Sequence, residues 1–136
     1  MILIVCIDKN GGMAFNNRRQ SQDLKLRERI LTITKNSTLL MNSYSMDLFG
    51  EHSQIRADEH FLDNAIEDDY CFAEDIDITP YENKITKIIL YKWNRAYPSD
   101  LKFGISLSDG WKLVKTEDFQ GNSHENITEE IYERAK

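Results

Sequence analysis

Two strongly apolar, β-branched runs constrain the fold of this chain more than any other feature. Residues 2–7 read Ile-Leu-Ile-Val-Cys-Ile, and residues 85–93 centre on Ile88-Ile89-Leu90. A strand with one solvated face alternates apolar and polar residues, whereas a strand covered on both faces is apolar throughout. Both runs therefore predict inner strands of a sheet that is covered on its two faces.

The rest of the chain alternates between helix-like and strand-like segments. Helices are expected over residues 23–34, 43–49 and 58–66. The first would have Ser21 as its N-cap, and the second would end at Gly50. Strands are expected over 38–41, 70–73 and 111–119, the last at a sheet edge, and a polar loop over 16–22. This order predicts a single α/β domain over residues 1–136, with a mixed, mainly parallel sheet, helices on its faces and an antiparallel end.

The last segment, residues 127–134, fits two structures. Ile127, Ile131 and Tyr132 have helical spacing, but Ile127 and Ile131 would also share one face of a strand. Periodicity alone favours the helix.

The net charge and the two cysteines restrict the classes of binding partner and the cellular compartment that we expect. The net charge is −6, which disfavours direct binding to a nucleic acid backbone. Residues 58–77 hold nine carboxylates and no Lys or Arg, which indicates a solvated face or a surface for a basic protein. The apolar start is too short to cross a membrane, and Cys6 and Cys71 suggest reduced thiols in the cytoplasm.

Several segments, taken in order, resemble the dihydrofolate reductase family. They correspond to its first strand and turn, its mobile loop and first helix, its second strand, a late strand and its last hairpin, at residues 4–12, 16–24, 39–45, 88–91, 111–114 and 130–134. The resemblance implies the family's α/β fold with an antiparallel C-terminal hairpin. It therefore predicts a strand, not a helix, over residues 127–134.

The resemblance also shows where this chain departs from the family. An Arg that grips the 2′-phosphate of NADPH is replaced by Ser43, which has no guanidinium to fork a phosphate. A Gly-Gly pair that opens a helix over the pyrophosphate is replaced by residues 73–77, which include Glu74, Asp75 and Asp77. Three carboxylates there would repel a diphosphate. We therefore expect no cofactor, and NADPH in particular is disfavoured.

The resemblance implies a small set of site residues. Asp23 lies where the family has its substrate-side carboxylate, which makes it the candidate catalytic residue. Cys6, Arg27 and Trp93 are the candidate substrate-binding residues, and Arg27 is expected to lie near Asp23 and keep it ionised. The three histidines are far apart in the sequence, so no metal ligand is predicted.

Three functional hypotheses follow. The favoured one is a protein with the family's fold that has lost NADPH and binds a small polar ligand or a basic protein. The first alternative is a divergent reductase or pterin-related enzyme that uses Asp23, which would need a deep cleft between Asp23 and residues 12–20. The second is ribonuclease Z, but that family needs a His-x-His-x-Asp-His zinc cluster, which this sequence lacks, and a metallo-β-lactamase fold, for which 136 residues are too few.

Overall fold

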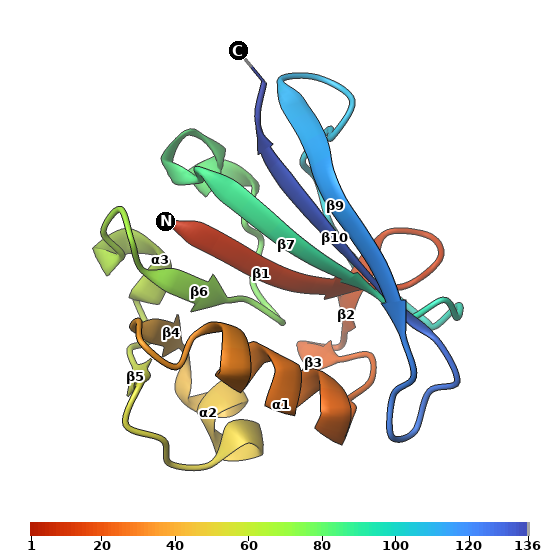
Figure 1. Ribbon diagram of the computed structural model, residues 1–136, viewed down its shortest axis with the longest axis horizontal. Helices are drawn as coiled ribbons and strands as arrows, with labels where there is room; N and C mark the ends of the chain where they lie inside the picture. The colour runs from red at the N-terminus through yellow and green to blue at the C-terminus, as the bar shows by residue number, and fades with distance from the viewer. Residues whose placement is uncertain (136) are drawn as a thin grey trace.

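The computed structural model describes residues 1–135, in which seven strands form one mixed sheet (Figure 1). The strands are β1 (Ile2–Ile7), β4 (Leu39–Met41), β5 (Ile55–Ala57), β6 (Tyr70–Phe72), β7 (Lys87–Lys92), β9 (Trp111–Phe119) and β10 (Ile127–Arg134). Their order across the sheet is β5-β4-β6-β1-β7-β10-β9. All neighbouring pairs from β5 to β7 are parallel.

The two apolar runs form the inner strands that their composition predicts. β1 pairs with β6 on one side and with β7 on the other, so that Leu3 lies between Cys71 and Ile88. Both Leu3 and Ile88 are completely buried. The prediction of inner strands is confirmed.

The C-terminal segment is a strand, as the family resemblance predicts. β10 runs antiparallel between β7 and β9, and Ile131 lies opposite Ile89 on one side and Lys115 on the other. β9 lies at one edge of the sheet, as predicted, and β5 lies at the other. The hairpin supplies backbone partners for the outer side of β7, which local helical spacing could not anticipate.

Helices α1 (Leu24–Ile33) and α2 (Ser43–Phe49) correspond to the first two predicted helices. Gly50 ends α2 with a φ of 79°, a backbone conformation that favours glycine. The predicted N-cap Ser21 is wrong. Asp23 is the N-cap of α1, because its backbone is extended and its Oδ1 accepts the N–H groups of Lys25 and Leu26.

Three segments differ from what the sequence predicts. The helix expected over residues 58–66 is reduced to α3 (Phe61–Asn64), because Ala65 is extended. β7 begins at Lys87, because a 3₁₀ helix occupies Thr79–Lys84. The expected loop at residues 16–22 contains a short strand, β3 (Arg18–Arg19).

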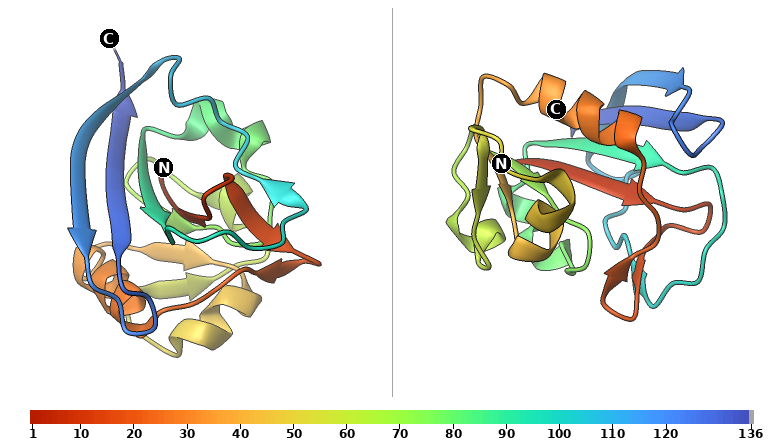
Figure 2. Two further views of the ribbon diagram at one scale, coloured as in Figure 1. Left: turned by 90° about the vertical axis from the view of Figure 1, so that its right-hand side faces the viewer. Right: turned by 90° about the horizontal axis from the view of Figure 1, so that it is seen from below.

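β3 belongs to a second, small sheet beside the first (Figure 2). Its other strands are β2 (Gly12–Phe15) and β8 (Leu101–Lys102). Asn16 and Asn17 join β2 to β3 with φ angles of 51° and 60°, the left-handed conformation that two-residue hairpin turns require.

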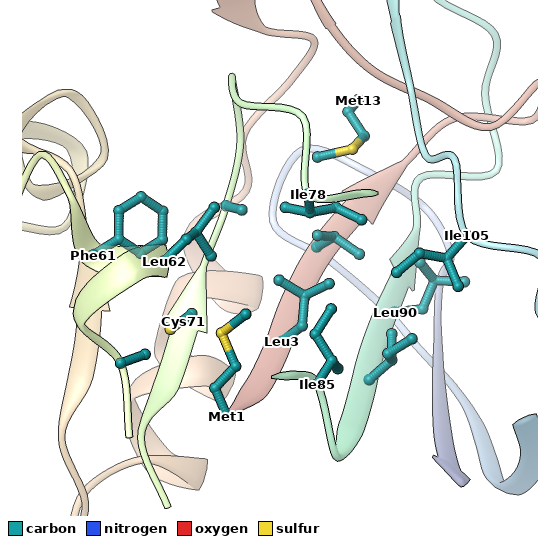
Figure 3. Close-up of a cluster of buried hydrophobic side chains, with 14 of the residues drawn as sticks. Met1, Leu3, Met13, Phe61, Leu62, Cys71, Ile78, Ile85, Leu90 and Ile105 are labelled. Atoms are coloured by element: carbon teal, nitrogen blue, oxygen red, sulfur yellow. The ribbon is translucent and has the colours of Figure 1, made fainter. Parts of the chain in front are cut away.

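Each face of the main sheet has its own apolar core. On one face, Leu26 and Ile30 of α1 and Phe49 of α2 pack with Ile4 and Ile89. The other face is covered by α3 and by loops. Figure 3 shows the side chains that meet there, among them Met1, Leu3, Phe61, Leu62, Ile78, Ile85, Leu90 and Ile105.

Candidate functional site

The four predicted site residues lie together although they come from four parts of the chain. Cys6 on β1, Asp23 before α1, Arg27 on α1 and Trp93 after β7 all line one cavity. Its volume is only about 10 Å³, enough for about one water molecule. The expected neighbourhood is therefore present, but it is filled by side chains.

Hydrogen bonds occupy both oxygens of Asp23, which is itself buried. Beyond the two α1 N–H groups, Oδ1 accepts the backbone N–H of Asn122 at 2.9 Å. Oδ2 accepts the N–H of Ser123 at 2.9 Å and lies 3.0 Å from His124 Nδ1. The carboxylate thus ties the start of α1 to the loop between β9 and β10.

These bonds set the charge state of Asp23. Burial raises its pKa, but the donors Asn122, Ser123, His124 and Leu26 together outweigh burial and hold the pKa below its ordinary value. Arg27 takes no part, because its guanidinium donates to Gln22 Oε1 at 3.0 Å. The expected pairing of Arg27 with Asp23 is therefore not formed. The pKa of Asp23 is lowered instead by backbone N–H groups and by the His124 ring.

His124 extends this network toward two hydroxyl groups. An ionised carboxylate only accepts hydrogen bonds, so Nδ1 carries the proton that faces Asp23. In the neutral imidazole Nε2 is then an acceptor, and it lies 3.0 Å from Ser21 Oγ and 3.2 Å from Tyr97 Oη. The ring also stacks on Trp93 with centroids 4.6 Å apart.

Ser21, His124 and Asp23 have the order of a serine hydrolase triad, which is recognised by geometry and not by fold. The two cavities that Ser21 lines hold only about 10 Å³ each, however, so neither of them admits a substrate carbonyl group. The chain of hydrogen bonds therefore fixes the β9–β10 loop. Gly121 in this loop accommodates it, since a Cβ there would lie 2.5 Å from Asp23 Oδ2.

Sequence reasoning did not identify His124 as a partner of Asp23. The two residues are 101 positions apart, and residues 120–126 form a polar run without periodicity. No local signal marks such a contact.

A second buried carboxylate lies just after β6, where the family resemblance placed the lost glycine pair. Glu74 accepts Arg19 Nε at 2.8 Å and Arg19 NH2 at 3.0 Å, a two-pronged ion pair. Ser45 Oγ donates to the same carboxylate at 2.7 Å. The guanidinium of Arg19 also lies over the ring of Tyr44, 4.2 Å from its centroid.

Hydrogen-bond donors at the start of α2 are also bound to carboxylates of the chain. Ser43 N–H donates to Glu59 Oε1 at 2.9 Å, and Asn42 Nδ2 donates to Asp75 Oδ1 at 2.9 Å. Together with the pair at Glu74, the donors in this region already bind carboxylates of the chain itself.

A much larger hollow than the cavity beside Asp23 lies between one side of α1 and the strands β7, β10 and β9. We call it the α1 groove. Its volume is about 690 Å³, within the range typical of small-molecule sites. Its lining residues are Lys25, Glu28, Arg29, Thr32, Ile33, Tyr70, Lys87, Ile89, Lys115, Phe119, Gln120, Glu129 and Ile131.

A buried carboxylate, Glu129, forms part of the floor of the α1 groove. It accepts Arg29 Nε and the hydroxyl of Tyr91, both at 2.8 Å. Burial raises its pKa, but the hydrogen bonds from Arg29 and Tyr91 outweigh burial, and its pKa is lowered. Alternation along the strand could have identified Glu129 as a buried residue, because Glu129 shares a strand face with Ile127 and Ile131.

Residues 1–135 lack both a cluster of metal ligands and a helix that could cross a membrane. No three His, Cys, Asp or Glu side chains there are grouped so as to hold a metal ion. No helix in this part of the chain is long and apolar enough to cross a membrane.

Comparison with known proteins supports the fold. No protein-family model and no curated protein matches the sequence. Among solved structures, the chain is similar to dihydrofolate reductase from Enterococcus faecalis, which was solved in complex with NADP(H) and RAB-propyl. The TM-score is 0.72 and the identity is 9%, over 99% of this chain and 96% of that one. The chain therefore has the dihydrofolate reductase fold, as the order of its segments predicted.

Proposed function

We propose that this chain is a binding module that has kept the dihydrofolate reductase fold and no longer uses NADPH. The observation that carries the proposal is the filled cavity beside Asp23, whose volume is about 10 Å³. Sites for ring-sized ligands have volumes of about 300–1,000 Å³. A reductase or pterin-related enzyme that used Asp23 would have to displace Trp93 or His124 to admit a ring.

The bonding of Asp23 supports the same conclusion. A carboxylate that binds a ligand edge needs a free acceptor site, and here both oxygens already accept backbone N–H groups. The lowered pKa of Asp23 also makes it a poor proton donor at neutral pH. Its contacts suit a structural role.

The residues near the expected dinucleotide position do not fit a diphosphate. Arg19 is neutralised by Glu74, and the N–H of Ser43 is taken by Glu59. An incoming phosphate would have to displace these carboxylates and then lie beside them. We derive no chemistry that depends on this cofactor.

A small ligand is a better candidate partner than a basic protein. Seven of the nine carboxylates in residues 58–77 already accept hydrogen bonds within the fold, namely Asp58, Glu59, Asp63, Asp69, Glu74, Asp75 and Asp77. Glu74 forms an ion pair with Arg19, and the other six accept hydrogen bonds from uncharged groups of the chain. Cys6 and Cys71 are free thiols, which supports placing the protein in a reducing compartment such as the cytoplasm.

Isothermal titration calorimetry with NADPH tests the proposal. Each lost charge-assisted contact weakens binding by about 1.5–3 kcal/mol, so two of them reduce the affinity by roughly two to four powers of ten. We expect no saturable heat up to high micromolar NADPH. A dissociation constant below about 10 μM would overturn the proposal.

Thermal shift measurements with NADH, folates and nucleotides complete the test. A dihydrofolate reductase that binds NADPH serves as the positive control. We expect the control to be stabilised by NADPH and folate and this chain to be unaffected. Saturable stabilisation of this chain by folate would favour the pterin-related alternative.

A further inference from the structure

The α1 groove combines an apolar floor with positive charges at its edges. Ile89 on β7 and Ile131 on β10 lie side by side in the floor, and Lys115 on β9 continues the same row of the sheet. Ile33 of α1 closes the groove from the helix side. An apolar body would therefore find aliphatic contacts on two sides.

The helix wall of the groove follows from helical periodicity. Lys25, Glu28, Arg29 and Thr32 are three or four residues apart, so they share one side of α1. The buried residues Leu26 and Ile30 hold the helix against the sheet. α1 ends at Ile33, and Figure 1 shows that β7, β10 and β9 extend beyond the helix.

In the part of the chain that the structure describes, two of the four cations that line the groove contact carboxylates and two do not. Arg29 and Lys115 contact Glu117 and Glu129, so they are neutralised in place. Within residues 1–135, Lys25 and Lys87 take part in no ion pair.

With Arg29 and Lys115 neutralised by Glu117 and Glu129, the remaining charges of the lining are two cations, Lys25 and Lys87, and one carboxylate, Glu28. The lining is therefore positive by one charge although the chain has a net charge of −6. The imbalance favours an anionic ligand.

The arrangement of the groove restricts where the charge of a ligand can lie. Glu129 is buried in the floor, and its carboxylate is held by Arg29 and Tyr91. A second buried anion beside it would be repelled. The anionic group of a ligand therefore belongs at the rim, near Lys25 or Lys87.

We propose that the α1 groove binds a small amphipathic anion, with its apolar body on Ile33, Ile89 and Ile131 and its carboxylate or sulfonate at Lys25 or Lys87. This inference rests on the proposed binding function and adds its site and ligand class. The volume of about 690 Å³ suits a molecule of two or three fused or linked rings, or an aliphatic chain of similar size.

Fluorescence titration of the full chain with 8-anilinonaphthalene-1-sulfonate tests this proposal. N-phenyl-1-naphthylamine has the same rings and no charge, and it is the matched probe. We expect saturable binding of the sulfonate with one site per chain, and binding of the uncharged probe weaker by about two- to fivefold, the range for one partly exposed ion pair. Equal affinity for both probes, or no saturable sulfonate signal, would overturn the proposal.

Variants at the exposed residues Thr32 and Lys102 and at the half-buried residue Lys87 locate the site without changing a fully buried side chain. Thr32→Glu places a negative charge on the groove wall, and Thr32→Gln is its neutral control of equal size. Lys87→Gln removes a rim charge, and Lys102→Gln on β8 removes an exposed charge on the second sheet. We expect Thr32→Glu and Lys87→Gln to weaken sulfonate binding about two- to fivefold relative to their controls. Equal affinities within both pairs would refute the site.

Amide chemical shifts in a two-dimensional NMR titration separate this inference from the proposed function. Changes centred on Ile89, Ile131 and Thr32 are expected. Changes centred on Cys6 and Trp93 would overturn the groove as the site while leaving a binding function in place. NADPH binding in the separate calorimetric test would overturn the proposed function whatever the sulfonate does.

Discussion

Replacing Asp23 with Asn is the most direct probe of the hydrogen-bond network that ties the start of α1 to the β9–β10 loop. The substitution keeps the shape of the side chain and leaves one acceptor oxygen where there were two. That oxygen would face the three N–H groups now bound by Oδ1, from Lys25, Leu26 and Asn122. The new NH₂ group would then point at the N–H of Ser123 and at His124 Nδ1, both of which now contact Oδ2.

The cost can be worked from these contacts. His124 can move its proton to Nε2 and accept from the new amide, because Ser21 and Tyr97 hydroxyls can act as acceptors. The N–H of Ser123 cannot reverse, and losing its acceptor costs about 1–3 kcal/mol. The remaining bonds lose their charge assistance, which is worth roughly 1 kcal/mol in addition. We expect Asp23→Asn to lower the free energy of unfolding by about 2–4 kcal/mol.

Urea denaturation at pH 7, followed by far-ultraviolet circular dichroism, measures this loss. For a domain of this size the same change lowers the melting temperature by roughly 10 °C. Asp47→Asn is the matched control, since Asp47 is exposed on α2. If Asp23→Asn cost less than about 1 kcal/mol more than the control, the carboxylate would not be holding the β9–β10 loop.

The same network gives stability a defined dependence on pH. The folded pKa of Asp23 lies below its ordinary value, so its contribution is complete above the unfolded pKa of about 3.9. The contribution is lost as the pH falls through the folded value. The stability gap between the parent and Asp23→Asn should therefore be full at pH 7 and narrower at pH 3. A gap of equal size at both pH values would contradict this reasoning.

Two chemical probes test the packing around the same region. A fluorophosphonate should add no mass to Ser21 in the folded chain, because the cavities that it lines hold about 10 Å³ each, and stoichiometric labelling of Ser21 would show that a substrate can enter. Burial raises the pKa of Cys71 to about 12 and raises the pKa of Cys6 well above its ordinary value. Ellman's reagent at pH 8 should therefore react slowly with half-buried Cys6 and with buried Cys71 until urea unfolds the chain, and rapid reaction of Cys71 in the folded protein would disprove its burial.

Much of the fold could be predicted from the sequence, because its decisive signals are local. The apolar run of β1 needs cover on both faces whatever surrounds it, and Gly50 supplies the backbone conformation that ends α2. Short elements were missed for the same reason. β3 has two residues, too few for any periodicity to be visible.

The C-terminal strand and the environment of the site depended on tertiary structure. The spacing of Ile127, Ile131 and Tyr132 favours a helix, and only the pairing of this segment with β7 and β9 makes it a strand. The order of the family-like segments could place Cys6 and Trp93 near Asp23, yet nothing in that order showed that the space between them is filled.

The hydrogen-bond partners of Asp23 and Glu74 show why the sequence alone did not reveal the surroundings of the site. His124 lies 101 residues from Asp23, and Arg19 lies 55 residues from Glu74. Sequence patterns report which residues prefer to be buried, because burial depends mainly on the residue itself and its near neighbours. Hydrogen bonds depend on the direction and distance of two specific groups, and only the folded chain fixes both.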